Sequence, residues 1–295
     1  MKKISLLLAL VIMLGALLAS CGGRSYKAYS VDPDYQSENT GSDSITFQDF
    51  DGNKITVKKG IQNIVCFSPE AALILRSIGS QKYIKAVDEN TTNVIVSNNV
   101  ITVDKIDEQN PEIVFIKESY NYTPKDDSVA CVTIPDDMTV NDTKTLIKII
   151  EKALESKKDS LADAIENQTN LAQAATNEYA NKYPVFVDLG NFSTVGNGTY
   201  VSEIVSISGG YNVFGDREGY FEVTAEEIAE ANPTFIFTSS DVSLYTRDRT
   251  LKTLDCVKEN RVIKIEPYKL NYASQNIAEC ISTMFAAINA VQTGS

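Results

Sequence analysis

The chain has 295 residues, 43% of them hydrophobic and 22% charged, which is the composition of a globular protein rather than a disordered one. It contains no His, which excludes Ser-His-Asp and Cys-His catalysis, His-based zinc sites and His-ligated haem. Its formal charge of −12 disfavours binding to the phosphate backbone of a nucleic acid. The length predicts about two domains.

The first 20 residues have the pattern of a signal peptide. Two lysines precede an almost wholly apolar run, residues 4–18, and small residues follow it. The sequence Leu18-Ala19-Ser20-Cys21 resembles the lipobox of bacterial lipoproteins, which implies that Cys21 becomes a lipidated N-terminus. A plain signal peptide cut near Ser20 is the alternative. Residues 21–44 are polar and lack apolar periodicity, so we expect a flexible tether.

Short apolar runs alternate with helical patterns through the rest of the chain, which is typical of parallel α/β sheets. A first lobe, residues 45–143, has expected strands at 63–67, 84–87, 113–116 and 129–134. Its first helix begins at Ser68-Pro69 and ends at Gly79. A second lobe, residues 184–295, has expected strands at 185–189, 235–238 and 262–265 and helices near 200–208, 224–231 and 274–291. The predicted fold class is α/β.

A strongly helical stretch, residues 144–183, separates the two lobes. The part from Asp159 to Lys182 contains no Gly or Pro, so one helix there would extend roughly 35 Å at about 1.5 Å per residue. Such a helix either packs on the surface of one sheet or forms a strut between two lobes.

An internal repeat favours the strut. Residues 102–116 (TVDKIDEQNPEIVFI) recur as residues 224–238 (TAEEIAEANPTFIFT), with Thr, Ile, Glu, Asn, Pro and Phe kept at six of the fifteen positions. Each copy predicts a capped helix, an Asn-Pro break and a buried strand. Thr224 and Glu227 form a capping box, whereas Lys105 gives Thr102 no such partner. We therefore expect two similar lobes joined by a single long α-helix.

Several segments resemble one protein family. Residues 45–57 (ITFQDFDGNKITV) and 63–71 (NIVCFSPEA) resemble the opening of substrate-binding lipoproteins of ABC importers for iron chelates, haem and vitamin B12. Residues 185–190, 201–210, 223–233 and 261–265 resemble the second lobe of that family. The resemblance implies two Rossmann-like lobes, a rigid connecting helix, a ligand cleft between the lobes and only small closure on binding.

The resemblance also implies what the protein does. It would be a monomer without enzymatic activity or cofactor, anchored by lipid to the outer face of the cell membrane. It would deliver a small-molecule chelate to an ABC permease and bind no nucleic acid. In this family one carboxylate at the tip of each lobe pairs with Arg residues of the permease, and the Asn-Pro register places those positions at Asp104 and Glu226. Both are expected in the first turn of a capped helix, where the helix dipole favours an anion.

Ligand-binding side chains are expected on loops that leave the carboxyl ends of the strands. The candidates on these loops are Ser68, Glu70, Tyr120, Tyr122, Asn191, Phe192, Arg217, Tyr220, Tyr245, Arg247, Tyr268 and Tyr272. Aromatic faces suit flat or bulky ligands, and Arg side chains suit anionic groups. An iron–siderophore-type chelate is the leading expectation, with cobalamin or Tyr-ligated haem as alternatives. No metal site made of protein side chains is expected.

Two other classes of protein are disfavoured. An α/β hydrolase-like enzyme would need a Gly-x-Ser-x-Gly elbow and a His, and the chain has neither. A surface adhesion protein would need an exposed apolar patch in place of a cleft. The remaining cysteines lack the paired spacing of metal or redox sites, so we expect buried thiols, with a disulfide as the alternative; they are Cys66, Cys131, Cys256 and Cys280.

Overall fold

The structure is a computed structural model that describes residues 43–156, 160–179 and 181–294, all within one compact unit. The predicted signal peptide, the lipobox with Cys21 and the tether up to residue 42 lie outside the described residues. Within the described ranges, no helix combines the length and the apolar character needed to cross a membrane.

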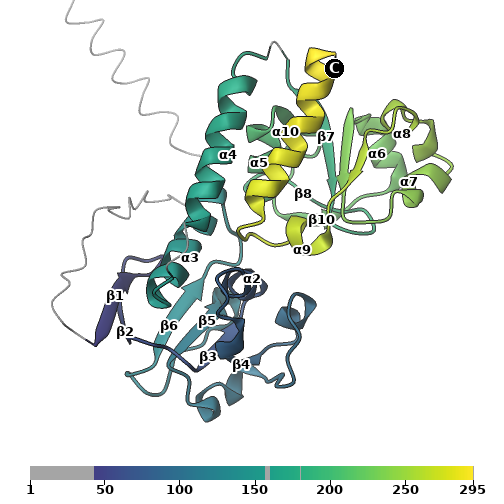
Figure 1. Cartoon of the computed structure of the whole chain (residues 1–295). Coiled ribbons are helices and arrows are strands. Elements are labelled where there is room, and N and C mark those ends of the chain that lie inside the picture. The colour runs from purple at the N-terminus through teal and green to yellow at the C-terminus, as the bar shows by residue number, and fades with distance from the viewer. Residues whose placement is uncertain (1–42, 157–159, 180, 295) are drawn as a thin grey trace, which may run out of the picture. The chain divides into compact units, whose positions relative to one another are not determined.

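The first lobe is built on a parallel sheet with the strand order β4-β3-β5-β6 (Figure 1). Helix α3 contacts both α2 and the antiparallel hairpin of β1 and β2, and β2 also contacts β6. The elements are β1 (Ser44–Gln48), β2 (Lys54–Lys58), β3 (Ile64–Phe67), α2 (Pro69–Ser77), β4 (Ile84–Val87), β5 (Ile113–Lys117), β6 (Ala130–Ile134) and α3 (Val140–Ala153).

The second lobe is built on a parallel sheet with the order β12-β11-β7-β9, and β8 and β10 form a separate short antiparallel pair. Its strands are β7 (Tyr183–Asp188), β8 (Ser193–Val195), β9 (Gly210–Asn212), β10 (Tyr220–Glu222), β11 (Phe235–Thr238) and β12 (Val262–Lys264). Its helices are α5 (Tyr200–Ile207), α6 (Ala225–Ala231), α7 (Ser243–Arg247), α8 (Asp255–Lys258), α9 (Pro267–Leu270) and α10 (Ile277–Thr293).

The two sheets have the same topology. In each, the first strand (β3 or β7) lies between the strand that follows its helix (β4 or β9) and the strand of the internal repeat (β5 or β11). Asn110 and Asn232, which precede the two prolines, have nearly the same left-handed backbone, with φ of 48° and 44°. Ile106 packs with Val114, and its repeat partner Ile228 packs with Ile236, the partner of Val114. The predicted repeat of two similar lobes is confirmed.

Both faces of each sheet are buried, which is why the strands read as continuous apolar runs. Alternate residues of β3, β5, β7 and β11 enter one hydrophobic cluster that also includes side chains of α3, α4 and α10, and this cluster extends through both lobes. The other faces are covered by two separate clusters, one for each lobe. The shared cluster holds the lobes together and favours a rigid body.

The connection between the lobes is shorter than predicted. Helix α4 (Leu161–Thr176) extends about 24 Å at about 1.5 Å per residue and ends six residues before Lys182. The chain leaves the helix there because Tyr179 packs over Gly209 and donates a hydrogen bond of 2.8 Å to Asn289 of α10. Helix α3 begins before residue 144 and packs on the first lobe, so α4 alone joins the lobes, beside α10 (Figure 1).

The first copy of the repeat does not form the predicted helix. Residues Val103–Lys105 and Asp107–Gln109 are two 3₁₀ turns, and the Thr102 hydroxyl donates to Asp104 instead of accepting a helix N–H. In the second copy, Thr224 accepts from the backbone of Glu227, and the Glu227 carboxylate accepts from the backbone of Thr224. Lys105 cannot return such a bond, so only the second copy is capped as an α-helix.

The other predicted elements are present with ends within three residues of those expected. The hairpin of β1 and β2, the pair of β8 and β10, strand β9 and helices α7 to α9 were not predicted as separate elements. They are short, between three and five residues each, and carry little periodicity.

Candidate ligand-binding site

Two cavities in the described part of the chain lie at the carboxyl ends of the two sheets. The first cavity, of about 340 Å³, is lined by Phe67, Pro69, Glu70, Asp88, Asn90, Asn93, Lys117, Ser119, Tyr120, Asp136 and Tyr272. The second cavity, of about 720 Å³, is lined by Leu189, Gly190, Asn191, Ser239, Ser240, Asp241, Ser243, Leu244, Arg247, Asp248, Pro267 and Asn271.

The two cavities are neighbours. Tyr272 of the second lobe lines the first cavity, and Asn271, the residue before it, lines the second. The segment that follows α9 therefore lies between the two cavities. A ligand larger than either cavity could contact both sheets across this segment.

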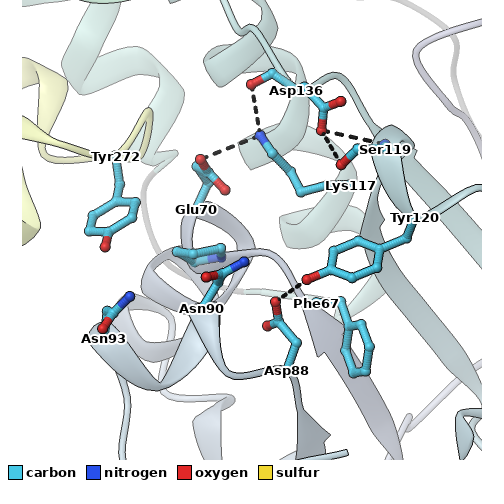
Figure 2. A pocket seen from close by; sticks show the side chains of 11 residues that line it. Phe67, Glu70, Asp88, Asn90, Asn93, Lys117, Ser119, Tyr120, Asp136 and Tyr272 are labelled. Carbon is cyan, nitrogen blue, oxygen red and sulfur yellow. Dashed lines mark hydrogen bonds and ion pairs between the residues drawn. The ribbon is translucent and has the colours of Figure 1, made fainter. Parts of the chain in front are cut away.

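The first cavity is organised around Glu70, in the first turn of α2. The buried Ser68 hydroxyl caps this helix by accepting from the backbone of Ala71 and donates to Glu70 Oε2 at 2.8 Å. Lys117 Nζ lies 3.4 Å from Glu70 Oε1 and donates to the carbonyl oxygen of Asp136 at 3.1 Å (Figure 2). It also donates to the carbonyl oxygen of Pro135 at 2.8 Å. One ammonium group thus ties together the chain segments that follow β3, β5 and β6.

Tyr120 and Asp88 form the opposite wall of the first cavity. The Tyr120 hydroxyl donates a short hydrogen bond to Asp88 Oδ2, and the other oxygen of Asp88 accepts from the backbone of Thr91 at 3.0 Å. Burial, together with Asp88, raises the pKa of Tyr120 to about 12. The Tyr120 ring packs edge-to-face on Phe67, with 5.3 Å between ring centroids. The phenol therefore stays protonated, with its proton directed at Asp88.

Two tyrosines of the second lobe lie near Glu70, and one of them, Tyr272, lines the first cavity. Tyr272 points into the cavity from its segment, with its hydroxyl end directed toward Asn93 (Figure 2). Burial, together with the nearby Glu70 carboxylate, raises the pKa of Tyr272. Tyr220 of β10 is half exposed, and burial of its hydroxyl end, with Asp137 and Glu70 nearby, raises its pKa to about 12. Glu70 of the first lobe thus lies near two tyrosines of the second lobe.

The second cavity is organised by Asp188, a buried residue at the end of β7. Its Oδ1 accepts from the backbone of Gly190 at 2.8 Å and of Phe192 at 2.9 Å. Its Oδ2 accepts from the hydroxyls of Thr238 and Tyr245, both at 2.7 Å. These bonds stabilise a loop in which two consecutive residues that are not Gly, 191 and 192, have positive φ.

Five of the predicted ligand-binding residues line a cavity. They are Glu70, Tyr120 and Tyr272 in the first cavity and Asn191 and Arg247 in the second. Ser68 does not line a cavity but donates a hydrogen bond to Glu70, which does. Tyr220 lies near Glu70 without lining the cavity.

The remaining predicted residues are engaged elsewhere. Tyr245 is fully buried with its hydroxyl on Asp188, and Phe192 packs on the Tyr245 ring. Tyr122 donates to Asp107 at 2.9 Å. Arg217 pairs with Glu227 at 2.9 Å and stacks on two Phe rings, and Tyr268 lies under the guanidinium of Arg76. These side chains line neither cavity, because each packs against or pairs with a partner within the protein, and their contact with a ligand stays a prediction.

Several lining residues were not predicted, among them Asp88, Asn90, Asn93, Asp136, Ser240 and Asn271. Most of them follow a strand within a few residues, so their position directly after an apolar run was an available signal. Asn271 and Asn93 lie further along their loops, and the sequence carries no comparable signal for them.

Asp104 and Glu226 are exposed at equivalent positions of the repeat. The backbones of Thr102 and Thr224 before them agree closely, with φ of −92° and −90° and ψ of 162° and 163°. The hydrogen bond from Thr102 lowers the pKa of Asp104. Only Glu226 lies in the first turn of an α-helix, so the helix dipole favours an anion there more than at Asp104.

The four described cysteines are free thiols, and burial raises the pKa of Cys280 to about 12. Among the described residues, no group of three or more His, Cys, Asp or Glu side chains could hold a metal ion.

No protein-family model matches the sequence, and no curated protein matches it. Solved structures do match. The molybdate periplasmic binding protein MolA of Haemophilus influenzae has a TM-score of 0.69 at 18% identity, over 84% of this chain and 92% of that one. The periplasmic vitamin B12 binding protein BtuF of Vibrio cholerae has a TM-score of 0.60 at 16% identity, over 79% of this chain and 98% of that one.

A third similar structure is the periplasmic haem-binding protein RhuT of Roseiflexus, with a TM-score of 0.59 at 16% identity, over 78% of this chain and all of that one (100%). These similarities establish the fold. The chain has the two-lobed α/β fold of periplasmic solute-binding proteins, and proteins with this fold bind solutes as different as molybdate, vitamin B12 and haem.

Proposed function

We propose that this protein is an extracytoplasmic solute-binding lipoprotein that captures a small-molecule chelate between its lobes and delivers it to an ABC permease. The observation that carries the proposal is the pair of cavities at the carboxyl ends of the two sheets, one lined by Tyr272 and the other by its chain neighbour Asn271. Two sheet ends that face one ligand are what a capture protein with this fold needs.

The ligand in this proposal is an iron–siderophore-type chelate, with cobalamin as the alternative. Glu70, Tyr120 and Tyr272 contact it from the first cavity, and Asn191 and Arg247 contact it from the second. Tyr-ligated haem is a weaker alternative, because a phenolate ligand requires loss of a proton and the pKa of Tyr120 is raised to about 12.

Anchoring and delivery complete the proposal. Cys21 carries the lipid that holds the protein on the outer face of the cell membrane. Asp104 and Glu226, exposed at equivalent positions of the two lobes, each pair with a cationic residue of the permease. Such charge-assisted contacts orient docking more than they add affinity.

A thermal-shift screen of the chain without its signal peptide tests the function. The panel contains ferric siderophores, corrinoids and haemin. A ligand present at about 100 times its Kd should add about 2.7 kcal/mol to the free energy of unfolding. Tyr272→Ala should reduce that gain, whereas Tyr211→Ala, at an exposed Tyr of β9 outside both cavities, should not. If no member of the panel raises the melting temperature, the proposed function is wrong.

A further inference from the structure

The lining of the first cavity is negatively charged. It carries three carboxylates, Glu70, Asp88 and Asp136, and one cation, Lys117. The second cavity has Asp241 and Asp248 against Arg247. The whole chain has a formal charge of −12, so the long-range field has the same sign as both cavities.

The cation of the first cavity is already occupied. A Lys ammonium has three donors, and those of Lys117 face Glu70 Oε1, the Pro135 carbonyl and the Asp136 carbonyl. Its side chain is only 14% exposed, and that of Glu70 is 12% exposed. An anionic ligand would have to break these contacts before it could use the ammonium. Glu70 and Lys117 offset each other's charge, so the lining keeps the negative charge of Asp88 and Asp136.

The aromatic walls of the first cavity also suit a cation. Tyr120 lines the cavity with its hydroxyl donating to Asp88, and Tyr272 lines it from the other lobe (Figure 2). The faces of aromatic rings attract cations through their quadrupole. Carboxylates and ring faces thus favour the same sign of ligand charge.

The Arg side chains expected to meet anionic groups do not reverse the negative charge of the cavity linings. Arg217 is paired with Glu227 and lines neither cavity, which leaves Arg247 as the Arg that lines one of them.

We infer that the captured solute carries a net positive charge, and that its cationic group occupies the first cavity, whose lining keeps a net negative charge beside the rings of Tyr120 and Tyr272. This inference rests on the proposed function and adds the charge class of the ligand to it.

Three chelates of matched size test the inference. The first is a ferric linear trihydroxamate with a terminal ammonium, the second is the same chelate with that amine acetylated, and the third is an anionic ferric tris-catecholate. Binding to the chain without its signal peptide is measured by isothermal titration calorimetry. The ammonium chelate should bind at least about tenfold more tightly than its acetylated form, and the catecholate more weakly than both. The affinity of the ammonium chelate should also fall as salt rises from about 50 to about 500 mM.

A charge-neutral variant locates the effect. Glu70→Gln should weaken binding of the ammonium chelate about tenfold and leave the acetylated chelate unchanged. The control Asp127→Asn removes one charge from an exposed position of the same lobe outside the cavity and should change neither affinity. If Glu70→Gln does not fold, Asp136→Asn provides the same comparison.

The outcomes separate the two proposals. If the acetylated or the anionic chelate binds as tightly as the ammonium form, the inference is overturned and the proposed function stands. Equal loss of both hydroxamates in the neutral variant would show a structural role for Glu70 and would also overturn it. If none of the chelates, corrinoids or haemin binds, both proposals fail together.

Discussion

Replacing Asp188 with Ala should remove the acceptor that holds the loop after β7 in place. The buried carboxylate accepts four hydrogen bonds, two from the backbone of Gly190 and Phe192 and two from the hydroxyls of Thr238 and Tyr245. Hydrogen bonds to a charged group contribute about 1.5–3 kcal/mol each, and the two hydroxyls can rotate toward other acceptors. We therefore expect the free energy of unfolding to fall by about 4–6 kcal/mol, mainly because the two backbone N–H groups lose their acceptor.

Asp188→Asn should cost much less than Asp188→Ala. The amide oxygen can stay at the Oδ1 position and accept from the two backbone N–H groups, which can only donate. The amide nitrogen then faces the hydroxyls of Thr238 and Tyr245, which can turn to accept its two protons. This variant loses only the extra strength that a charged acceptor gives to a hydrogen bond. We therefore expect the free energy of unfolding to fall by about 1–2 kcal/mol.

Urea denaturation and thermal melts measure both variants. For a domain of this size, the Ala variant should melt roughly 10–20 °C below the parent. Asp216→Ala, at an exposed acid of the same lobe, is the control and should stay within about 0.5 kcal/mol. A loss below about 1 kcal/mol for Asp188→Ala, or equal losses for the two Asp188 variants, would refute the hydrogen-bond reasoning.

Thr224→Ala should destabilise the protein by about 1 kcal/mol and Thr102→Ala by clearly less, because only Thr224 accepts a helix N–H; equal losses in urea would contradict this. The free energy of unfolding should fall as pH rises from about 10 to about 12, because the folded chain keeps the Tyr120 proton after the unfolded chain has released its own, and Tyr120→Phe should flatten that decline in a pH series of melts. Asp104→Lys combined with Glu226→Lys should abolish uptake in a transport assay and leave ligand affinity unchanged, since both side chains are exposed outside the cavities; uptake by this variant would disprove the docking role.

The fold was predictable because the parallel strands are buried on both faces and appear as apolar runs. The repeat was predictable for a similar reason: Ile106 and Ile228 fill the same place in their lobes, and the Asn before each Pro adopts the left-handed backbone that ends the segment. The difference between Thr102 and Thr224 follows from Lys105 in place of Glu227, and the sequence already contained that difference.

The candidate site was predictable only as a set of loops. Tyr245 lies on one of them, yet its side chain turns inward because Asp188, 57 residues earlier in the chain, accepts its hydroxyl. Arg217 does not reach a cavity, because its guanidinium donates a hydrogen bond to Glu227. The Glu227 carboxylate also completes a helix cap. Such partners are set by tertiary packing, and no local pattern indicates which aromatic or Arg side chain of a loop will be captured by the protein itself.

Asn271 and Tyr272 are joined by a peptide bond and face different cavities, so the two halves of the binding site cannot be reshaped independently along this segment. A shift of the backbone that widens the first cavity at Tyr272 also moves Asn271. The side-chain amide of Asn271 donates to the carbonyl oxygen of Leu189, which lines the second cavity. Directed evolution toward a new solute should therefore keep the length of this segment and accumulate exchanges in the loops after β4, β5 and β11, where each substitution changes one cavity at a time.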